Sequence, residues 1–213
     1  MKIDLNRLHY PVTVLGPGRR IGLWVQGCSI GCPGCLSRDT WAISQDARIE
    51  VEEVVQWCRD HKAVDGVTIS GGEPFQQPEA LLELLVQLDA WRCEYAPWMD
   101  FLCYSGLPWA KLRRDFPEIL ARLDALIPEP FVESLPTDAA WRGSANQTLI
   151  PLSALGRQKY AAVDAPVDGD RLQVSAAEGQ IWLIGIPGRG ALDRTLAAAE
   201  QRGISVETTS WNA

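Results

Sequence analysis

The sequence predicts an α/β protein with a mainly parallel β-sheet covered by helices. Between residues 20 and 128, short apolar runs typical of buried strands alternate with stretches whose apolar residues recur at helical spacing. This alternation is typical of parallel strands joined by right-handed helical crossovers. The strands are too few for a closed eight-stranded barrel, so a partial barrel and an open sheet both fit. The expected strands are RIGLWVQG (20–27), GVTIS (66–70), DFLCYS (100–105) and DALIP (124–128).

Each expected helix carries its own signal. In EVEEVVQWCRDH (50–61) the apolar residues recur at i, i+3, i+4 and i+7, which places them on one helical face. In QPEALLELLVQLDAWR (77–92) the leucines form one stripe, and Pro78 suits a first helical turn. A third stretch, residues 108–123, is interrupted at Pro117, because proline lacks the backbone N–H that a helix interior needs.

The character of the chain changes after residue 150, where Asp, Pro and Gly become frequent and residues 151–171 read as a loop. We therefore predict a core over residues 1–150 and an α+β extension over residues 151–213, either a small subdomain or added edge strands. The extension is expected to hold a hairpin of RLQVSA (171–176) and QIWLIGI (180–186) turning at Glu178-Gly179, a helix near 190–202 stopped by Gly203, and a last strand ISVETTSW (204–211).

The composition indicates where the protein is located and which partners it has. The chain has 213 residues, of which 46% are apolar and 22% charged, as in ordinary globular proteins. No apolar run approaches the roughly 18 residues of a membrane span, and the N-terminus lacks a signal-peptide pattern. We therefore expect a cytoplasmic protein with no membrane partner. The net charge of −7 argues against a nucleic-acid partner, whose phosphates need a basic surface.

Three of the six cysteines cluster in GCSIGCPGC (27–35), with the spacing C-x3-C-x2-C at Cys28, Cys32 and Cys35. A structural zinc site usually takes four ligands, whereas only three cysteines cluster here. A [4Fe–4S] cluster normally takes four cysteines, so three would leave one iron open to a small molecule. A cluster with an open iron, a zinc site and three unligated core cysteines are the alternatives at this point.

Two further segments follow expected strands. ISGGEP (69–74) has two glycines that let a ligand approach the backbone closely, although a plain β-turn would give the same pattern. CYSG (103–106) taken alone is an ordinary strand-to-helix loop. Sites in parallel α/β folds gather beyond the carboxyl ends of the strands, where the cysteine loop and both of these segments are expected. Their shared position predicts that the three converge on one site.

The combination of C-x3-C-x2-C and GGEP resembles the radical S-adenosylmethionine (SAM) superfamily. GPGRRIGLWVQGC (16–28) and CLSRDTW (35–41) resemble the segments that enter and leave the cluster loop in its activase branch. FLCYSG (101–106) and WRGSANQTLI (141–150) are similar to segments of the activases of anaerobic ribonucleotide reductases. The resemblance covers roughly residues 10–150 and implies a partial (β/α) barrel of the radical SAM type.

The resemblance also implies an activity. A radical SAM oxidoreductase cleaves SAM reductively at a [4Fe–4S] cluster and yields a 5′-deoxyadenosyl radical. The activase branch implies that this radical installs a glycyl radical on a partner enzyme under anaerobic conditions. Direct action on a peptide or small molecule is the alternative. Either activity implies an external reductant such as flavodoxin or ferredoxin.

The roles of individual residues follow only from the resemblance. Cys28, Cys32 and Cys35 would each hold one iron, and the amino and carboxylate groups of SAM would bind the fourth. No acid–base catalyst is implied, because abstraction of a hydrogen atom needs none. The residues expected to contact SAM are Gly34, Leu36, Gly71, Gly72, Glu73, Pro74, Tyr104 and Ser105.

The chain departs from the family pattern at two places. Many superfamily members have an aromatic residue before the third cysteine, where this chain has Gly34, as the reductase activases do. Those activases read roughly V-D-G-P-F where this chain reads IPEPF (127–131), so Glu129 stands in place of glycine. The segment beyond residue 150 is also longer than those activases need.

Overall fold

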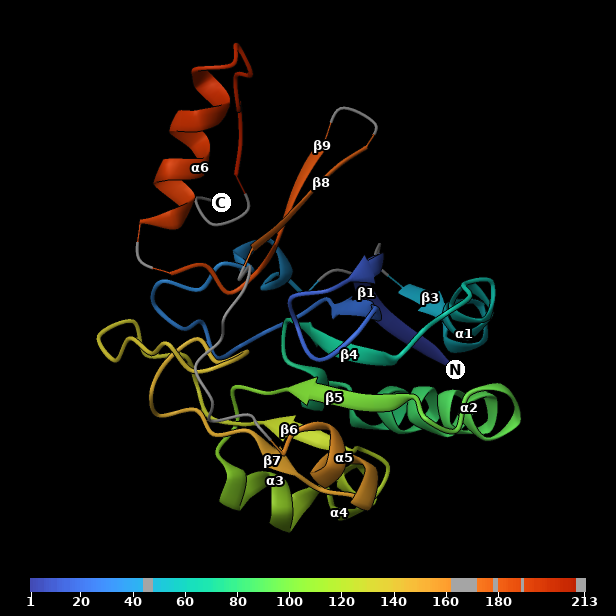
Figure 1. Cartoon of the computed structure of the whole chain (residues 1–213). Coiled ribbons are helices and arrows are strands. Elements are labelled where there is room, and N and C mark those ends of the chain that lie inside the picture. The colour runs from blue at the N-terminus through green and yellow to red at the C-terminus, as the bar shows by residue number, and fades with distance from the viewer. Residues whose placement is uncertain (44–47, 162–171, 178–179, 189, 210–213) are drawn as a thin grey trace.

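The computed structural model describes residues 1–43, 48–161, 172–177, 180–188 and 190–209. Seven strands form one sheet in the order β3-β1-β2-β4-β5-β6-β7, and β8 and β9 form a separate two-stranded hairpin (Figure 1). The strands are β1 (Lys2–Val12), β2 (Arg20–Val25), β3 (Arg48–Glu50), β4 (Gly66–Gly71), β5 (Asp100–Tyr104), β6 (Ala125–Ile127), β7 (Ile150–Pro151), β8 (Leu172–Ala177) and β9 (Gln180–Gly185). The α-helices are α1 (Val51–Arg59), α2 (Pro78–Tyr95), α3 (Trp109–Asp115), α4 (Pro117–Leu120), α5 (Ala154–Lys159) and α6 (Ala191–Glu200), with short 3-10 helices η1 (Arg38–Thr40) and η3 (Pro74–Gln76).

The centre of the sheet is parallel. β2, β4, β5 and β6 pair in parallel, whereas β1, β3 and β7 pair antiparallel toward the edges. The predicted α/β class and the four predicted strands are therefore confirmed. β1 was not predicted, because register shifts between Leu5 and Arg7 and between His9 and Val12 interrupt the alternation of apolar and polar residues that identifies a strand.

Helices α1 to α4 pack on one face of the sheet. The predicted leucine stripe of α2 is fully buried, and so is the predicted apolar face of α1 that ends at Cys58. These side chains form a continuous core with Ile21, Leu23 and Val25 of β2. The break at Pro117 is also confirmed, since Phe116 separates α3 from α4. The predictions succeed here because burial follows the helical period.

The extension was predicted less completely. The hairpin and α6 are confirmed, although the turn at Glu178-Gly179 lies outside the described residues. The predicted last strand is wrong, since residues 204–209 form no strand. Helix α5 forms where a loop was expected, because the Ser153 hydroxyl accepts a hydrogen bond from the Gly156 N–H and caps the helix.

The hairpin packs against the turn between β1 and β2. The Gln173 side chain accepts a hydrogen bond from the Thr13 N–H at 2.9 Å and donates one to the Pro11 carbonyl at 2.7 Å. Ile184 is buried in a small cluster with Val12 and Trp24. Figure 1 shows the orange hairpin standing away from α1 and α2, with the red helix α6 beyond it.

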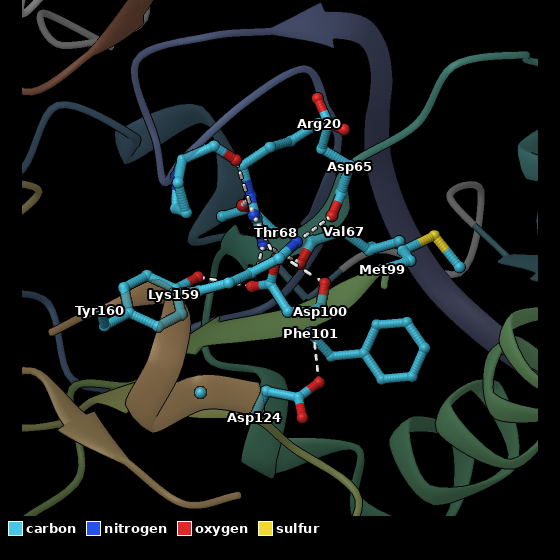
Figure 2. Close-up of polar contacts among 12 residues, drawn as sticks. Arg20, Asp65, Val67, Thr68, Met99, Asp100, Phe101, Asp124, Lys159 and Tyr160 are labelled. Carbon is cyan, nitrogen blue, oxygen red and sulfur yellow. Dashed lines mark hydrogen bonds and ion pairs between the residues drawn. The ribbon is translucent and has the colours of Figure 1, made fainter. Parts of the chain in front are cut away.

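A buried ionic network ties the amino ends of the central strands together (Figure 2). Arg20 and Asp100 are fully buried, and two Arg20 nitrogens each lie 2.9 Å from an Asp100 oxygen. The Lys159 ammonium and the Tyr160 hydroxyl also donate to Asp100, at 2.7 and 2.5 Å. Burial alone would raise the pKa of Asp100, but the charge of Arg20 and the hydrogen bonds from its partners lower it. A Cβ at Gly66 would lie 2.3 Å from the Arg20 guanidinium, so glycine makes room for it.

We expect Arg20→Met to lower the free energy of unfolding by about 3–5 kcal/mol, because it leaves the Asp100 carboxylate buried without its main counter-charge. Chemical denaturation of both proteins measures the difference. Arg114→Met is the matched control, since Arg114 pairs with Asp115 on the surface with 74% of its side chain exposed. The expectation is wrong if the two variants unfold at the same denaturant concentration.

Candidate cofactor site

A cavity of about 120 Å³ lies at the carboxyl ends of β2, β4, β5 and β6. The cysteine loop, the GGEP segment and the YSG segment all contribute to its wall, so their predicted convergence is confirmed. A larger surface groove of about 420 Å³ runs between α2 and α4, but it contains none of these segments. The cavity is lined by Cys28, Ile30, Cys32, Cys35, Trp41, Ser70, Gly71, Gly72, Glu73, Tyr104, Ser105, Gly106, Glu129, Phe131 and Gln147.

The cysteine loop folds back on itself after β2. Gly27 has φ +97°, which an L side chain rarely adopts, so glycine permits the turn that leads into the loop. The Gly27 N–H donates to the Thr40 carbonyl at 2.7 Å, and the Cys28 N–H donates to the Trp41 carbonyl at 3.1 Å. The two ends of the loop are therefore bonded to each other, and the three thiols between them border the same cavity.

This donor set fits an iron–sulfur cluster. Thiolates are the usual ligands of such clusters, and each thiolate binds a different iron, so the ligands border a common cavity rather than meet at one point. In the described parts of the chain, no three His, Cys, Asp or Glu side chains are grouped so as to hold a single ion. Burial raises the pKa of the Cys32 thiol, while a backbone hydrogen bond from Phe131 opposes that rise.

The two glycines of GGEP let the segment lie directly against the cysteine loop. The Gly72 N–H donates to the Val25 carbonyl and the Glu73 N–H donates to the Gly27 carbonyl, both at 2.8 Å. A Cβ at Gly72 would lie 2.3 Å from the Gly27 carbonyl oxygen, and one at Gly71 would lie 2.5 Å from the Val25 nitrogen. The close approach that these glycines allow is therefore an approach of backbone to backbone.

Glu73 joins the GGEP segment to the YSG segment. Its side chain is fully buried. One carboxylate oxygen accepts hydrogen bonds from the Ser105 hydroxyl at 2.8 Å and the Phe75 N–H at 3.1 Å, and the other accepts from the Gly106 N–H at 2.7 Å. Burial raises the pKa of Glu73, and these three hydrogen bonds oppose the rise. The carboxylate thus fixes two walls of the cavity relative to each other.

The other expected SAM contacts divide into two groups. Tyr104 and Ser105 line the cavity, and the Tyr104 hydroxyl donates to the Trp141 carbonyl at 2.8 Å. Gly34, Leu36 and Pro74 are not among the described residues of the lining. A Cβ at Gly34 would lie 2.9 Å from the Glu133 carboxyl carbon, so Glu133 occupies the space beside that glycine.

Sequence reasoning missed several lining residues, of which Glu129 is the most unusual. Its φ is +81°, in the region that favours glycine. Its carboxylate accepts a hydrogen bond from the Trp109 N–H at 3.0 Å, and its carbonyl accepts one from Gln147 at 3.0 Å. The departure at IPEPF was the signal that could have identified it. The other missed residues are Ile30, Trp41, Ser70, Gly106, Phe131 and Gln147.

Three thiols around one cavity at the carboxyl ends of parallel strands are a donor set that fits an iron–sulfur protein. Comparison with known proteins agrees, since a family described as a 4Fe-4S single cluster domain matches residues 14–150. The chain belongs to this family. The family description gives it a [4Fe–4S] cluster, and relatives that are at least 30% identical place it among the activating proteins of anaerobic ribonucleoside-triphosphate reductases.

Several similar proteins are named anaerobic ribonucleoside-triphosphate reductase-activating protein. The relative from Escherichia coli K12 is 28% identical over 147 residues, which cover 66% of this chain and 94% of the relative. The relative from Enterobacteria phage T4 is 30% identical over 150 residues, covering 69% and 93%. The relative from Vibrio cholerae is 31% identical over 147 residues, covering 66% and 94%. A solved structure, QueE from Escherichia coli, aligns with 58% of this chain and 69% of its own at 17% identity and a TM-score of 0.43.

We expect Gly72→Ala to lower the free energy of unfolding by about 1–3 kcal/mol, because the added methyl group forces the GGEP segment away from the Gly27 carbonyl. Thermal or chemical unfolding measures the change. Gly188→Ala is the control, since a Cβ at Gly188 has no atom of another residue within 4 Å. Equal stability of the two variants would contradict the close contact.

We expect the stability advantage of the wild type over Glu73→Gln to shrink as the pH rises. The native state holds the Glu73 proton more tightly than the unfolded state, because burial raises its pKa above 4.5. The stabilisation that comes from this tighter binding of the proton is fully present below the pKa of the unfolded state. It is lost as the pH rises through the raised pKa of the native state. Melting temperatures of both proteins between about pH 5 and pH 8 test it. Parallel pH profiles for the two proteins would show that Glu73 does not titrate in this way.

Proposed function

We propose that Cys28, Cys32 and Cys35 hold the [4Fe–4S] cluster and that the GGEP and YSG segments bind SAM beside it. The observation that carries the proposal is the single cavity that the three thiols share with both segments. The backbone carbonyls of Gly71 and Gly72 accept hydrogen bonds from the ammonium group of SAM. The remaining proposed SAM contacts are Gly34, Leu36, Glu73, Pro74, Tyr104 and Ser105.

Cys28, Cys32 and Cys35 would hold the cluster, which, given one electron by an external reductant, would supply the chemistry for reductive cleavage of bound SAM to methionine and a 5′-deoxyadenosyl radical. The protein contributes position and shielding. Glu73 holds the GGEP and YSG walls together through its three hydrogen bonds. Tyr104 forms part of the wall and donates its hydroxyl to the Trp141 carbonyl, and burial raises the pKa of that hydroxyl.

The proposed partner is a glycyl radical enzyme, on which the chain installs the radical. The names of the relatives support this choice, since those proteins activate an anaerobic ribonucleoside-triphosphate reductase. We also propose an external reductant such as flavodoxin or ferredoxin, and the cytoplasm as the location. Among the helices of the described ranges, none combines the length and apolar character that crossing a bilayer requires.

In structural terms, we propose that the sheet is the partial (β/α) barrel of the superfamily and that the chain divides into residues 1–150 and 151–213. Direct action on a peptide or small molecule is the second candidate. Two observations favour it: Glu129 adds a carboxylate to the cavity wall, and Trp182 of the extension belongs to the same apolar cluster as Tyr104. Both features alter the surroundings in which a substrate would lie.

Anaerobic reconstitution tests the proposal. The wild type should take up four irons and four sulfides per chain and, with dithionite and SAM, release 5′-deoxyadenosine. Cys28→Ala, Cys32→Ala and Cys35→Ala should each lose most of that turnover. Cys93→Ala is the matched control and should behave as wild type, since Cys93 is exposed on α2. A wild type that holds the cluster but releases no 5′-deoxyadenosine would overturn the proposal.

A second measurement separates the two candidate functions. The protein is mixed with SAM, reductant and an anaerobic ribonucleotide reductase encoded beside it, and the reductase is examined by EPR. A glycyl radical doublet on the reductase supports activation. Release of 5′-deoxyadenosine without any radical on the reductase favours direct action on another substrate.

A further inference from the structure

The segment that follows the GGEP glycines holds both chain neighbours of Cys28. On one side of Cys28, the Gly27 carbonyl accepts the hydrogen bond from the Glu73 N–H at 2.8 Å. On the other side, the Ser29 N–H donates to the Gln76 side-chain carbonyl at 3.1 Å, and the Gln76 amide donates back to the Ser29 hydroxyl at 2.5 Å. Cys28 is thus held between two anchors that come from one short segment.

The Gln76 contact is specific to an amide side chain. Ser29 offers a donor in its N–H and an acceptor in its hydroxyl, and one amide group can satisfy both at once. Gln76 lies in η3, whose first turn is fixed by the bond from the Phe75 N–H to the Glu73 carboxylate. The position of the amide is therefore set by the same carboxylate that sets the wall of the cavity.

The adjacent residue, Gln77, contacts the sheet instead of the cysteine loop. The Gln77 amide donates to the carbonyls of Asp4 and Gln26, at 2.9 and 3.0 Å, and so ties η3 to β1 and to the end of β2. Gln77 holds η3 against the sheet, whereas Gln76 reaches outward from the fixed helix to the cysteine loop. Gln77 therefore stabilises the fold, whereas Gln76 orients the cysteine loop.

We infer that Gln76 is a positioning residue that sets the direction of the Cys28 thiol toward the cluster. The inference rests on the proposed function, because it assigns Cys28 to the cluster. Groups that orient a metal ligand without touching the metal tune its affinity and its electronic properties. Gln76 links the ligand loop to the GGEP segment, so the cluster and the proposed SAM site keep one fixed relation.

The contact can be removed without unfolding the protein. Gln76 and Ser29 are both exposed, and a solvent-accessible hydrogen bond contributes little net stability because water replaces the lost partner. Gln87→Ala is the matched control, because the Gln87 amide donates a hydrogen bond to the Glu83 carboxylate within α2 at 2.8 Å. Gln76→Ala and Gln87→Ala should melt at the same temperature.

The test compares reconstituted wild type, Gln76→Ala and Gln87→Ala under anaerobic conditions. Gln76→Ala should lose its cluster iron to a chelator about tenfold faster than the wild type, as expected for loss of a group that orients a ligand. When SAM is added, the EPR spectrum of its reduced cluster should not show the same change as the spectrum of the wild type. Gln87→Ala should match the wild type in both measurements.

Ser29→Ala dissects the contact further. It removes the hydroxyl but keeps the bond from the Ser29 N–H to Gln76, so its effect should lie between wild type and Gln76→Ala. The double variant Ser29→Ala/Gln76→Ala should be no worse than Gln76→Ala alone, because both changes remove the same contact. Additive effects would show that Gln76 acts through another group.

The outcomes distinguish the inference from the proposed function. If the wild type binds no cluster, or its spectrum ignores SAM, the proposed function fails. If the wild type binds the cluster and responds to SAM, and Gln76→Ala matches it in chelation rate and spectrum, the inference about Gln76 fails and the proposed function stands.

Discussion

The buried pair of Arg20 and Asp100 holds the amino ends of β2 and β5 together across β4. Burying both charges is costly, and such pairs seldom add net stability compared with an apolar pair. What the pair does here is fix position, because Arg20 also donates to the Thr68 hydroxyl and the Val67 carbonyl within β4. Three parallel strands are thereby held at one end. The loops at the opposite end can then carry the cysteines and glycines of the cavity without also having to hold the sheet together.

The same network shows how far the core extends. Lys159 and Tyr160 reach Asp100 from α5 and the residue after it, and Figure 2 shows both side chains converging on that carboxylate. A Cβ at Gly156 in α5 would lie 1.9 Å from the Asp124 carbonyl oxygen, so α5 lies directly on the chain that leads into β6. The first residues beyond the proposed division at residue 150, as far as Tyr160, therefore pack directly on the core.

The sequence predicted those parts of the molecule whose structure depends on neighbouring residues. The central strands and the stripes of α1 and α2 follow local apolar periods, and the convergence of three loops follows from strand order alone. The partners of polar side chains could not be predicted in this way. Gln76 and Ser29 are 47 positions apart, and so are many other residues with no contact. The close contact of Gly72 with the Gly27 carbonyl also could not be predicted from the sequence.

The extension is where this chain differs most from its relatives. The relative from Escherichia coli is matched over 94% of its length by 66% of this chain, so about a third of the chain has no counterpart there. The family match ends at residue 150, and the β8–β9 hairpin lies beyond it. The Arg7 guanidinium lies 5.4 Å from the ring centre of Trp182 in this hairpin and 5.6 Å from the ring centre of Trp24.

Arg7 in turn lies 2.6 Å from the carboxylate of Asp39, in the short helix that follows the cysteine loop. A cation between two indole rings is favourably placed, because each ring presents a negative face. The extension is therefore connected through one arginine to the exit of the cysteine loop, and through the Trp24 cluster to Tyr104 in the cavity wall. The hairpin beyond the family match thus contacts the core beside the site, on the sheet surface that helices α1 to α4 leave uncovered.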